Sequence, residues 1–173
     1  MGVKNFKIGL DQNEKIEFIA DVYKKLSKTM TMIFINERRF AQEIQSKLKS
    51  QGIEAKFLTA DLELAERDQL IDEFRKEVYP VLISTNILAR GIDVPQVDIV
   101  INFNIPVKQE GGRRMEPDYA NFMHRVGRTG RFGTDGIAVT FISKGHTHEP
   151  GFVENIAKEY SIEISELKSF SEF

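Results

Sequence analysis

The chain has 173 residues, of which 41% are hydrophobic and 29% charged; its formal net charge is −2 and it contains no cysteine. These values fit one globular domain and exclude wholesale disorder, disulfide frameworks, Cys-ligated metals and thiol nucleophiles. No apolar run approaches the roughly 18 residues of a membrane-spanning helix, and the first residues lack a signal-peptide core, so we expect a cytoplasmic or nuclear protein that is not secreted.

The apolar pattern changes repeatedly along the chain between the two-residue period of strands and the 3.6-residue period of helices. In chain order it predicts an edge strand at Lys4–Leu10, a helix at Glu14–Leu26, a buried strand at Thr31–Ile35, a helix at Arg38–Ser50, a strand at Glu54–Leu58, a helix at Leu64–Lys76, strands at Val81–Ser84, Asp98–Phe103 and Gly136–Ile142, and a helix at Phe152–Tyr160. This alternation predicts a single α/β domain with a mostly parallel sheet and helices on both faces. The irregular segment Val107–Pro117 is predicted to be a long surface loop.

Polar residues follow the predicted strand Val81–Ser84, and ligands of open parallel sheets bind beyond the carboxyl ends of strands. The segment offers the Thr85 hydroxyl, the Arg90 guanidinium, Gly91 and the Asp93 carboxylate. A glycine lets the backbone approach a phosphate or a sugar closely, and Asp93 could accept hydrogen bonds from ribose hydroxyls. The same residues are equally compatible with a short crossover that carries a surface arginine and a turn.

A second cluster, His124–Gly133, is rich in arginine and glycine. From Arg113 to Arg131 the chain carries five arginines against two acids, so the local charge is +3 in a chain that is slightly negative overall. Asp118 can cap a helix that runs toward this cluster, and Arg128 and Arg131 would then present two guanidinium groups to one phosphate. A solvated basic helix face is the alternative, but the cluster's three glycines are costly in such a helix.

The chain contains no Gly-x-x-x-x-Gly-Lys-Ser/Thr loop and no dinucleotide-binding glycine motif between a strand and a helix. It therefore lacks the backbone cradle that holds the phosphates of a nucleotide. If the domain contacts a triphosphate, it supplies arginines to a nucleotide that another domain holds, as an arginine finger does. His146 and His148 lack further ligands nearby and are expected in a surface loop, so we predict no metal site.

Two motifs, correctly ordered and spaced, resemble those of the C-terminal RecA-like domain of DEAD-box RNA helicases. Thr85–Asp93 matches Thr-x-x-x-Ala-Arg-Gly-x-Asp, and His124–Arg131 matches His-Arg-Ile-Gly-Arg-x-Gly-Arg with Val126 in place of isoleucine. The resemblance covers about residues 5–160 of a domain that spans 1–173. It implies that an N-terminal RecA-like domain with the Walker motif, outside this chain, binds ATP and Mg²⁺.

The resemblance also implies roles at the ATP site. Arg128 and Arg131 would contact the γ-phosphate, and His124 would couple this site to the acidic motif of the partner domain. Asp93 would contact the ribose, with Gly91 close by. These residues would complete an ATPase site only when the two domains close on each other.

For RNA, the resemblance implies that Thr85 and Arg67 contact backbone phosphates, which recognises RNA without reading its sequence. The chain departs from the family at Glu37, where a threonine is usual, and an acid there would repel a phosphate. Leu64 replaces the glutamine of the family's Gln-x-x-Arg motif, and Ala60-Asp61 replaces Gly-Asp.

The segment 107–123 is long for the family and, together with Asn102–Pro106, resembles the nuclear-pore mRNA-export branch. That branch implies mRNA export at the nuclear pore and an activator that acts with inositol hexakisphosphate. We expect a monomer that contacts no membrane.

The sequence thus predicts one half of an ATP-driven RNA clamp that remodels RNA–protein complexes, inactive as an isolated chain. A non-catalytic module that binds an acidic protein or an inositol phosphate through the arginine cluster is the alternative. A DNA-directed translocase is disfavoured by the Ala89-Arg90-Gly91-x-Asp93 sequence and the His124-led motif.

Overall fold

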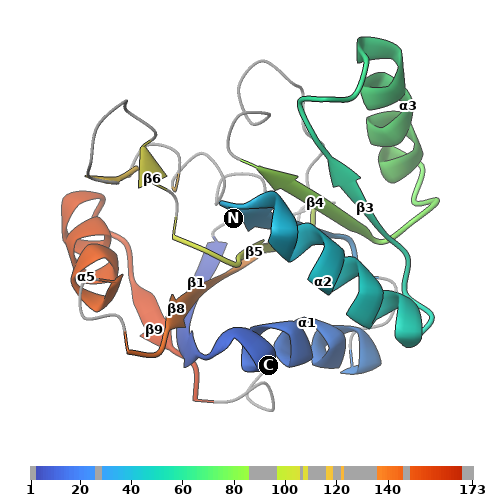
Figure 1. The fold of residues 1–173 in the computed structure, drawn as a ribbon. Helices are drawn as coiled ribbons and strands as arrows, with labels where there is room; N and C mark the ends of the chain where they lie inside the picture. Colours follow the sequence, from blue (N-terminus) through green and yellow to red (C-terminus); the bar gives the residue numbers. More distant parts are fainter. Residues whose placement is uncertain are drawn as a thin grey trace.

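A computed structural model of the chain describes residues 3–25, 29–85, 97–105, 107–108, 116–118, 122, 136–145 and 149–168 (Figure 1). Its elements in chain order are β1 (Val3–Leu10), α1 (Gln12–Lys25), β2 (Thr31–Ile35), α2 (Arg38–Ser50), β3 (Ala55–Leu58), α3 (Leu64–Arg75), β4 (Val81–Thr85), β5 (Ile99–Asn102), β6 (Val107–Lys108), β7 (Glu116–Pro117), β8 (Gly136–Ser143), α5 (Glu149–Glu159) and β9 (Ile164–Glu166). The helices and longer strands lie within a few residues of the predicted bounds.

The central sheet has seven strands in the order β3-β4-β2-β5-β8-β1-β9, and every pair of neighbours is parallel. In the middle, β2 pairs with β4 and β5, which aligns Ile35 with Thr85 and Phe34 with Asn102. The predicted parallel α/β architecture is therefore confirmed, and the carboxyl ends of β2, β3, β4 and β5 lie along one edge of the sheet.

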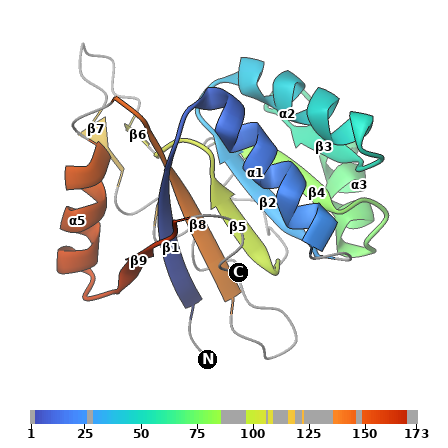
Figure 2. The same ribbon diagram turned by 90° about the horizontal axis from the view of Figure 1, so that it is seen from below.

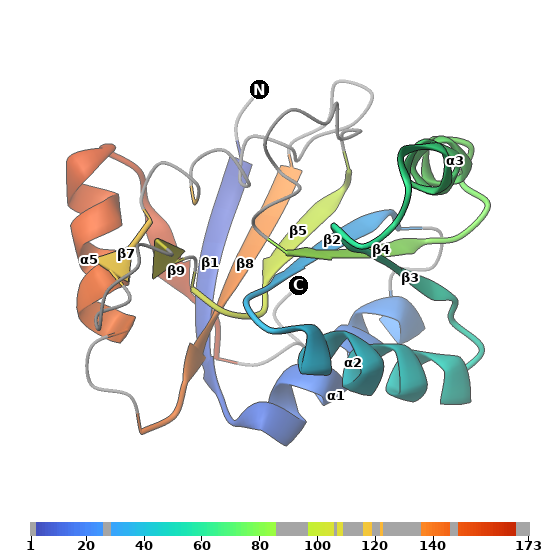
Figure 3. The same ribbon diagram turned by 45° about the horizontal axis from the view of Figure 1, so that its top comes forward.

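Helices cover both faces of the sheet, with α1 and α2 on one face and α3 on the other (Figure 3). Alternate residues of β2 divide between the faces: Ile33 and Ile35 pack with α1 and α2, whereas Met32 and Phe34 pack with α3. All five residues of β2 are buried, as the continuous apolar run predicts for a strand covered on both sides. The third apolar cluster joins α5 to β8.

The prediction that the first strand lies at an edge was wrong. β9 pairs in parallel with β1 outside it, aligning Asn5–Lys7 with Ile164–Glu166 (Figure 2). The apolar alternation of β1 correctly reports that one face is more buried than the other, because Ile8 and Leu10 are buried and Gly9 is exposed. Alternation says nothing about which strand lies beside β1, and three-residue β9 is too short to show a period of its own.

The predicted long loop also needs correction, because its two ends pair. Val107–Lys108 and Glu116–Pro117 form a short antiparallel ladder that aligns Val107 with Pro117 and Lys108 with Glu116. Two-residue strands leave no periodic signal in a sequence, and Pro117 cannot donate to a ladder, so the pattern argued against a strand.

The described residues include no helix with the length and apolar character needed to cross a membrane.

Candidate nucleic-acid interface

The carboxyl edge of the sheet carries polar residues directly after its buried strands. β2 leads into Asn36 and Glu37, β4 ends at the half-buried Thr85, and β5 leads into Phe103 and Asn104. Because parallel neighbours end at the same edge, these segments lie beside one another along it. This edge is where the sequence predicts ligand binding.

Asn36 ties together the segments that follow β2 and β5. Its backbone N–H donates to the Asn104 Oδ1 at 2.9 Å, and its side-chain Nδ2 donates to the Ile105 carbonyl at 2.9 Å. Its Oδ1 is buried and has no hydrogen-bond partner in the structure as described. The two bonds fix the turn into α2 relative to the chain that leaves β5.

The first turn of α2 places two arginines at this edge, and each is paired with an acid. Arg38 forms an ion pair with Asp61, which lies in the turn after β3. Arg39 Nε lies 2.6 Å from a carboxylate oxygen of Glu37. The hydrogen bond from Arg38 lowers the pKa of the Asp61 carboxyl and raises the pKa of the Arg38 guanidinium. Both pairs are solvent-exposed, so their charges remain accessible to an anionic ligand.

Arg67 lies on α3 close to the same turn. Its Nε donates to the Leu62 carbonyl at 3.0 Å, and its side chain is partly buried. Thr59 holds the turn together, since its Oγ1 accepts from the Asp61 N–H at 2.9 Å and its carbonyl accepts from the Leu62 N–H at 3.3 Å. The turn between β3 and α3 is therefore bound by Arg38 on one side and by Arg67 on the other.

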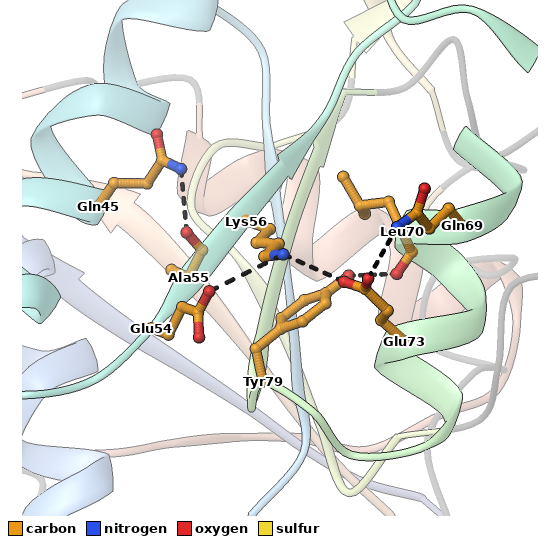
Figure 4. Close-up of polar contacts among 8 residues, drawn as sticks. All are labelled: Gln45, Glu54, Ala55, Lys56, Gln69, Leu70, Glu73 and Tyr79. Carbon is orange, nitrogen blue, oxygen red and sulfur yellow. Dashed lines mark hydrogen bonds and ion pairs between the residues drawn. The ribbon is translucent and has the colours of Figure 1, made fainter. Parts of the chain in front are cut away.

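A polar cluster at the outer edge of the sheet fixes α3 in place (Figure 4). Lys56 of β3 donates to Glu73 of α3 at 3.1 Å, and Gln69 donates to the other oxygen of that carboxylate at 3.2 Å. The Tyr79 hydroxyl donates to the Leu70 carbonyl at 2.6 Å. Burial raises the pKa of Tyr79, so this hydroxyl keeps its proton. These contacts position the helix that carries Arg67.

On β3 itself, the Ala55 carbonyl accepts a hydrogen bond from the Gln45 side chain at 3.0 Å (Figure 4). A side chain thus occupies an acceptor on the outermost strand of the sheet. This occupied acceptor and the charged Lys56 make the edge a poor template for another strand. These contacts hold β3 and its neighbouring helices together, and they are separate from the carboxyl edge.

Of the predicted site residues, the structure describes Arg67 and Thr85, and both belong to the elements that form the carboxyl edge. The other predicted site residues lie outside the described residues: Gly91, Asp93, His124, Arg128 and Arg131. Phe122, the one described residue of the predicted approach to the arginine cluster, donates its N–H to the Asp118 carbonyl at 3.1 Å. That bond has helical spacing.

The sequence prediction missed Asn36 and Arg38 as members of this edge. A usable signal was present, since both lie within three residues of the end of a strand predicted to be buried on both faces. Their partners could not be predicted from local spacing. Arg38 and Asp61 are 23 residues apart, and Asn36 and Ile105 are 69 apart.

A seven-stranded parallel sheet with helices on both faces, and a polar carboxyl edge, defines a RecA-like α/β domain. The model of the helicase conserved C-terminal domain matches residues 14–133. The chain is 38% identical over 169 residues to the ATP-dependent RNA helicase eIF4A of Saccharomyces cerevisiae, covering 97% of this chain and 40% of that protein. It is 42% identical over 132 residues to the ATP-dependent RNA helicase DBP5 of Candida glabrata, covering 76% of this chain and 25% of that protein.

Solved structures of DEAD-box proteins have the same fold. The C-terminal domain of the DEAD-box protein Dbp5 superposes with a TM-score of 0.85 at 34% identity, covering 96% of this chain and 91% of that one. Dbp5 of S. cerevisiae bound to RNA and ADP BeF3 gives 0.79 at 34% identity, covering 96% and 41%. A variant of that Dbp5 bound to Gle1 and IP6 gives 0.82 at 34% identity, covering 96% and 42%.

The chain belongs to the helicase conserved C-terminal domain family, and its homologues are DEAD-box RNA helicases. It spans about two fifths of the length of the eIF4A relative.

Proposed function

We propose that this chain is the second RecA-like half of an ATP-dependent RNA helicase that remodels RNA–protein complexes. The single observation that carries the proposal is the carboxyl edge of the RecA-like sheet, where Thr85 ends β4 and Arg67 lies in the first turns of the preceding helix, α3. The homologous helicases, and the Dbp5 structure bound to RNA and ADP BeF3, support an assignment to RNA and ATP. The chain acts together with an N-terminal RecA-like domain that holds ATP.

RNA binds along the carboxyl edge through its phosphates. The Arg67 Nε is engaged by the Leu62 carbonyl, which orients the guanidinium and leaves its terminal nitrogens as donors to a phosphate. The Thr85 hydroxyl supplies a second donor from the end of β4. Contacts of this kind hold the RNA backbone without selecting a sequence.

The ATP-binding site is completed by residues of both domains. Asp93 and Gly91 follow β4 and face the ribose, whereas Arg128 and Arg131 reach the γ-phosphate and His124 couples them to the partner domain. ATP supplies the phosphoryl group that is cleaved, and Mg²⁺ is held by the N-terminal domain. The arginines stabilise charge that develops on the phosphoryl oxygens, as arginine fingers do.

Within the helicases, we place the chain in the Dbp5-like branch, which acts in mRNA export at the nuclear pore. The support is the similarity to Dbp5 structures, including one bound to Gle1 and IP6. An activator acting with inositol hexakisphosphate is the partner that this branch implies. Stimulation of RNA-dependent ATP turnover by such an activator, and only in the presence of the inositol phosphate, tests this assignment.

The RNA site is tested with Arg67→Ala in the full-length protein. Loss of a hydrogen bond to a charged phosphate predicts RNA binding weaker by about tenfold. It also predicts a fall of about 0.7 in the salt slope, the value for one phosphate of a single strand. Arg75→Ala is the matched control, because it removes the same charge from the opposite end of α3. Equal RNA affinities for the two variants would contradict the proposed site.

A further inference from the structure

Arg38 occupies a position suited to a phosphate ligand, yet a carboxylate already holds it. It is the first residue of α2 and lies three residues after the end of β2, and its partner Asp61 lies in the turn between β3 and α3. Both residues thus border the carboxyl edge that carries Arg67 and Thr85. A guanidinium binds a phosphate and a carboxylate through the same planar arrangement of donors, so the two anions compete for it.

The ion pair is placed so that it can open. The side chains of Arg38 and Asp61 are 56% and 69% exposed, and pairs in that environment contribute little to stability. The neighbouring pair of Arg39 and Glu37 is equally exposed. Replacing an exposed carboxylate by a phosphate therefore costs little.

The turn that carries Asp61 does not depend on the ion pair for its shape. The Asp61 N–H donates to Thr59 Oγ1, the Leu62 N–H donates to the Thr59 carbonyl, and Arg67 Nε donates to the Leu62 carbonyl. These bonds remain if Asp61 releases Arg38. The carboxylate is therefore free to leave without disturbing Arg67.

We propose that Asp61 restrains RNA binding: it holds Arg38 in the free protein, and RNA binds by exchanging this carboxylate for a backbone phosphate. The proposal rests on the proposed function, because it concerns the same RNA edge. It makes Asp61 a determinant of RNA affinity and of the salt dependence of that affinity. Asp61 acts on RNA through Arg38 and does not contact it.

The test measures binding of a labelled single-stranded RNA to the full-length protein with a non-hydrolysable ATP analogue. Asp61→Asn frees Arg38 and should tighten RNA binding by about two- to fivefold at low salt. The gain should shrink as salt rises, because salt screens the ion pair that the variant removes. Asp72→Asn is the matched control: Asp72 pairs with Lys76 at 2.9 Å, is comparably exposed and lies at the other end of α3. It should leave RNA affinity unchanged.

A double-mutant cycle separates exchange from general electrostatics. Arg38→Ala should weaken RNA binding, and adding Asp61→Asn to it should give no gain. Tighter RNA binding on adding Asp61→Asn to Arg38→Ala would mean that Asp61 merely repels RNA. Weaker RNA binding by Asp61→Asn alone would mean that Asp61 holds Arg38 in the pose that binds RNA. Either result overturns the proposal.

The failures of the two proposals can be told apart with the same assay. If Arg67→Ala weakens RNA binding but Asp61→Asn changes nothing, the exchange is wrong and the RNA edge stands. If Arg67→Ala and Arg38→Ala both leave RNA affinity unchanged, the RNA edge itself is wrong, and the exchange fails with it.

Discussion

Asn36 is the residue that holds the candidate site together at its centre. Its side chain donates to the Ile105 carbonyl and its backbone N–H donates to Asn104 Oδ1, so one residue joins the chain segments after β2 and β5. The segment after β2 carries Arg38 and Arg39. Their position relative to the rest of the edge therefore depends on the two hydrogen bonds that Asn36 donates.

Replacing Asn36 by alanine should lower the free energy of unfolding by about 1–2 kcal/mol, because the Ile105 carbonyl loses its donor. Equilibrium denaturation with urea measures the change. RNA affinity should fall with it, since the first turn of α2 is then less well fixed. An unchanged unfolding midpoint would show that water replaces the amide at no cost.

At the scale of elements, α3 positions Arg67, and apolar and polar contacts hold the helix against the rest of the domain. Phe74 is 1% exposed, and its ring lies 5.4 Å from that of Tyr79. Phe74→Ala should cost about 3–5 kcal/mol, the range for a large aromatic residue removed from a core. Leu64→Ala on the same helix is the control; Leu64 is 69% exposed, so the cost should stay within about 0.5 kcal/mol. Similar unfolding midpoints for the two variants would contradict the packing described.

The polar contact of α3 predicts a dependence on pH. Hydrogen bonds from Lys56 and then from Gln69 lower the pKa of the Glu73 carboxyl below its usual 4.5. A carboxyl whose pKa is lower in the folded state stabilises the fold above the unfolded pKa and loses this effect as pH falls. Glu73→Gln should therefore lower the thermal midpoint at neutral pH and converge with the native protein in acid. Lys56→Gln should give the same profile, and a gap that persists in acid would contradict the account.

Elements with a sustained period could be predicted from the sequence, and those set by pairing could not. The run Thr31–Ile35 is apolar at every position after the threonine, and the strand is buried at every position. β9 has three residues and exists because it aligns with Asn5–Lys7, which only the folded chain brings close. The same holds for the site: motifs predicted Arg67 and Thr85, but the pairing of Arg38 with Asp61 depends on sheet order.

At the scale of the whole molecule, the proposed function makes the chain one part of an ATPase whose phosphate-binding loop lies in another domain. The sequence has no Gly-x-x-x-x-Gly-Lys-Ser/Thr segment. We therefore predict that the purified chain alone hydrolyses no ATP, with or without RNA. RNA-stimulated turnover above the background of a mock preparation would contradict this prediction.

The net charge of the chain limits where it could attract RNA. The net charge is −2, so attraction of RNA cannot come from the molecule as a whole. Under the proposed function it comes from arginines at one edge of the sheet, where acids such as Glu37 and Asp61 limit it. We therefore expect an RNA affinity of modest size, with a salt dependence set by the few phosphates that these arginines neutralise.

The most direct test is RNA-stimulated ATP turnover of the full-length protein with Arg128→Ala, with RNA binding measured on the same preparation. Arg75→Ala, at the far end of α3, serves as the control for loss of an arginine. The account predicts that Arg128→Ala lowers turnover by at least about a thousandfold while RNA binding is retained, the effect of an arginine finger. Unchanged turnover would contradict it, and would leave an RNA- or protein-binding module in place of half an ATPase.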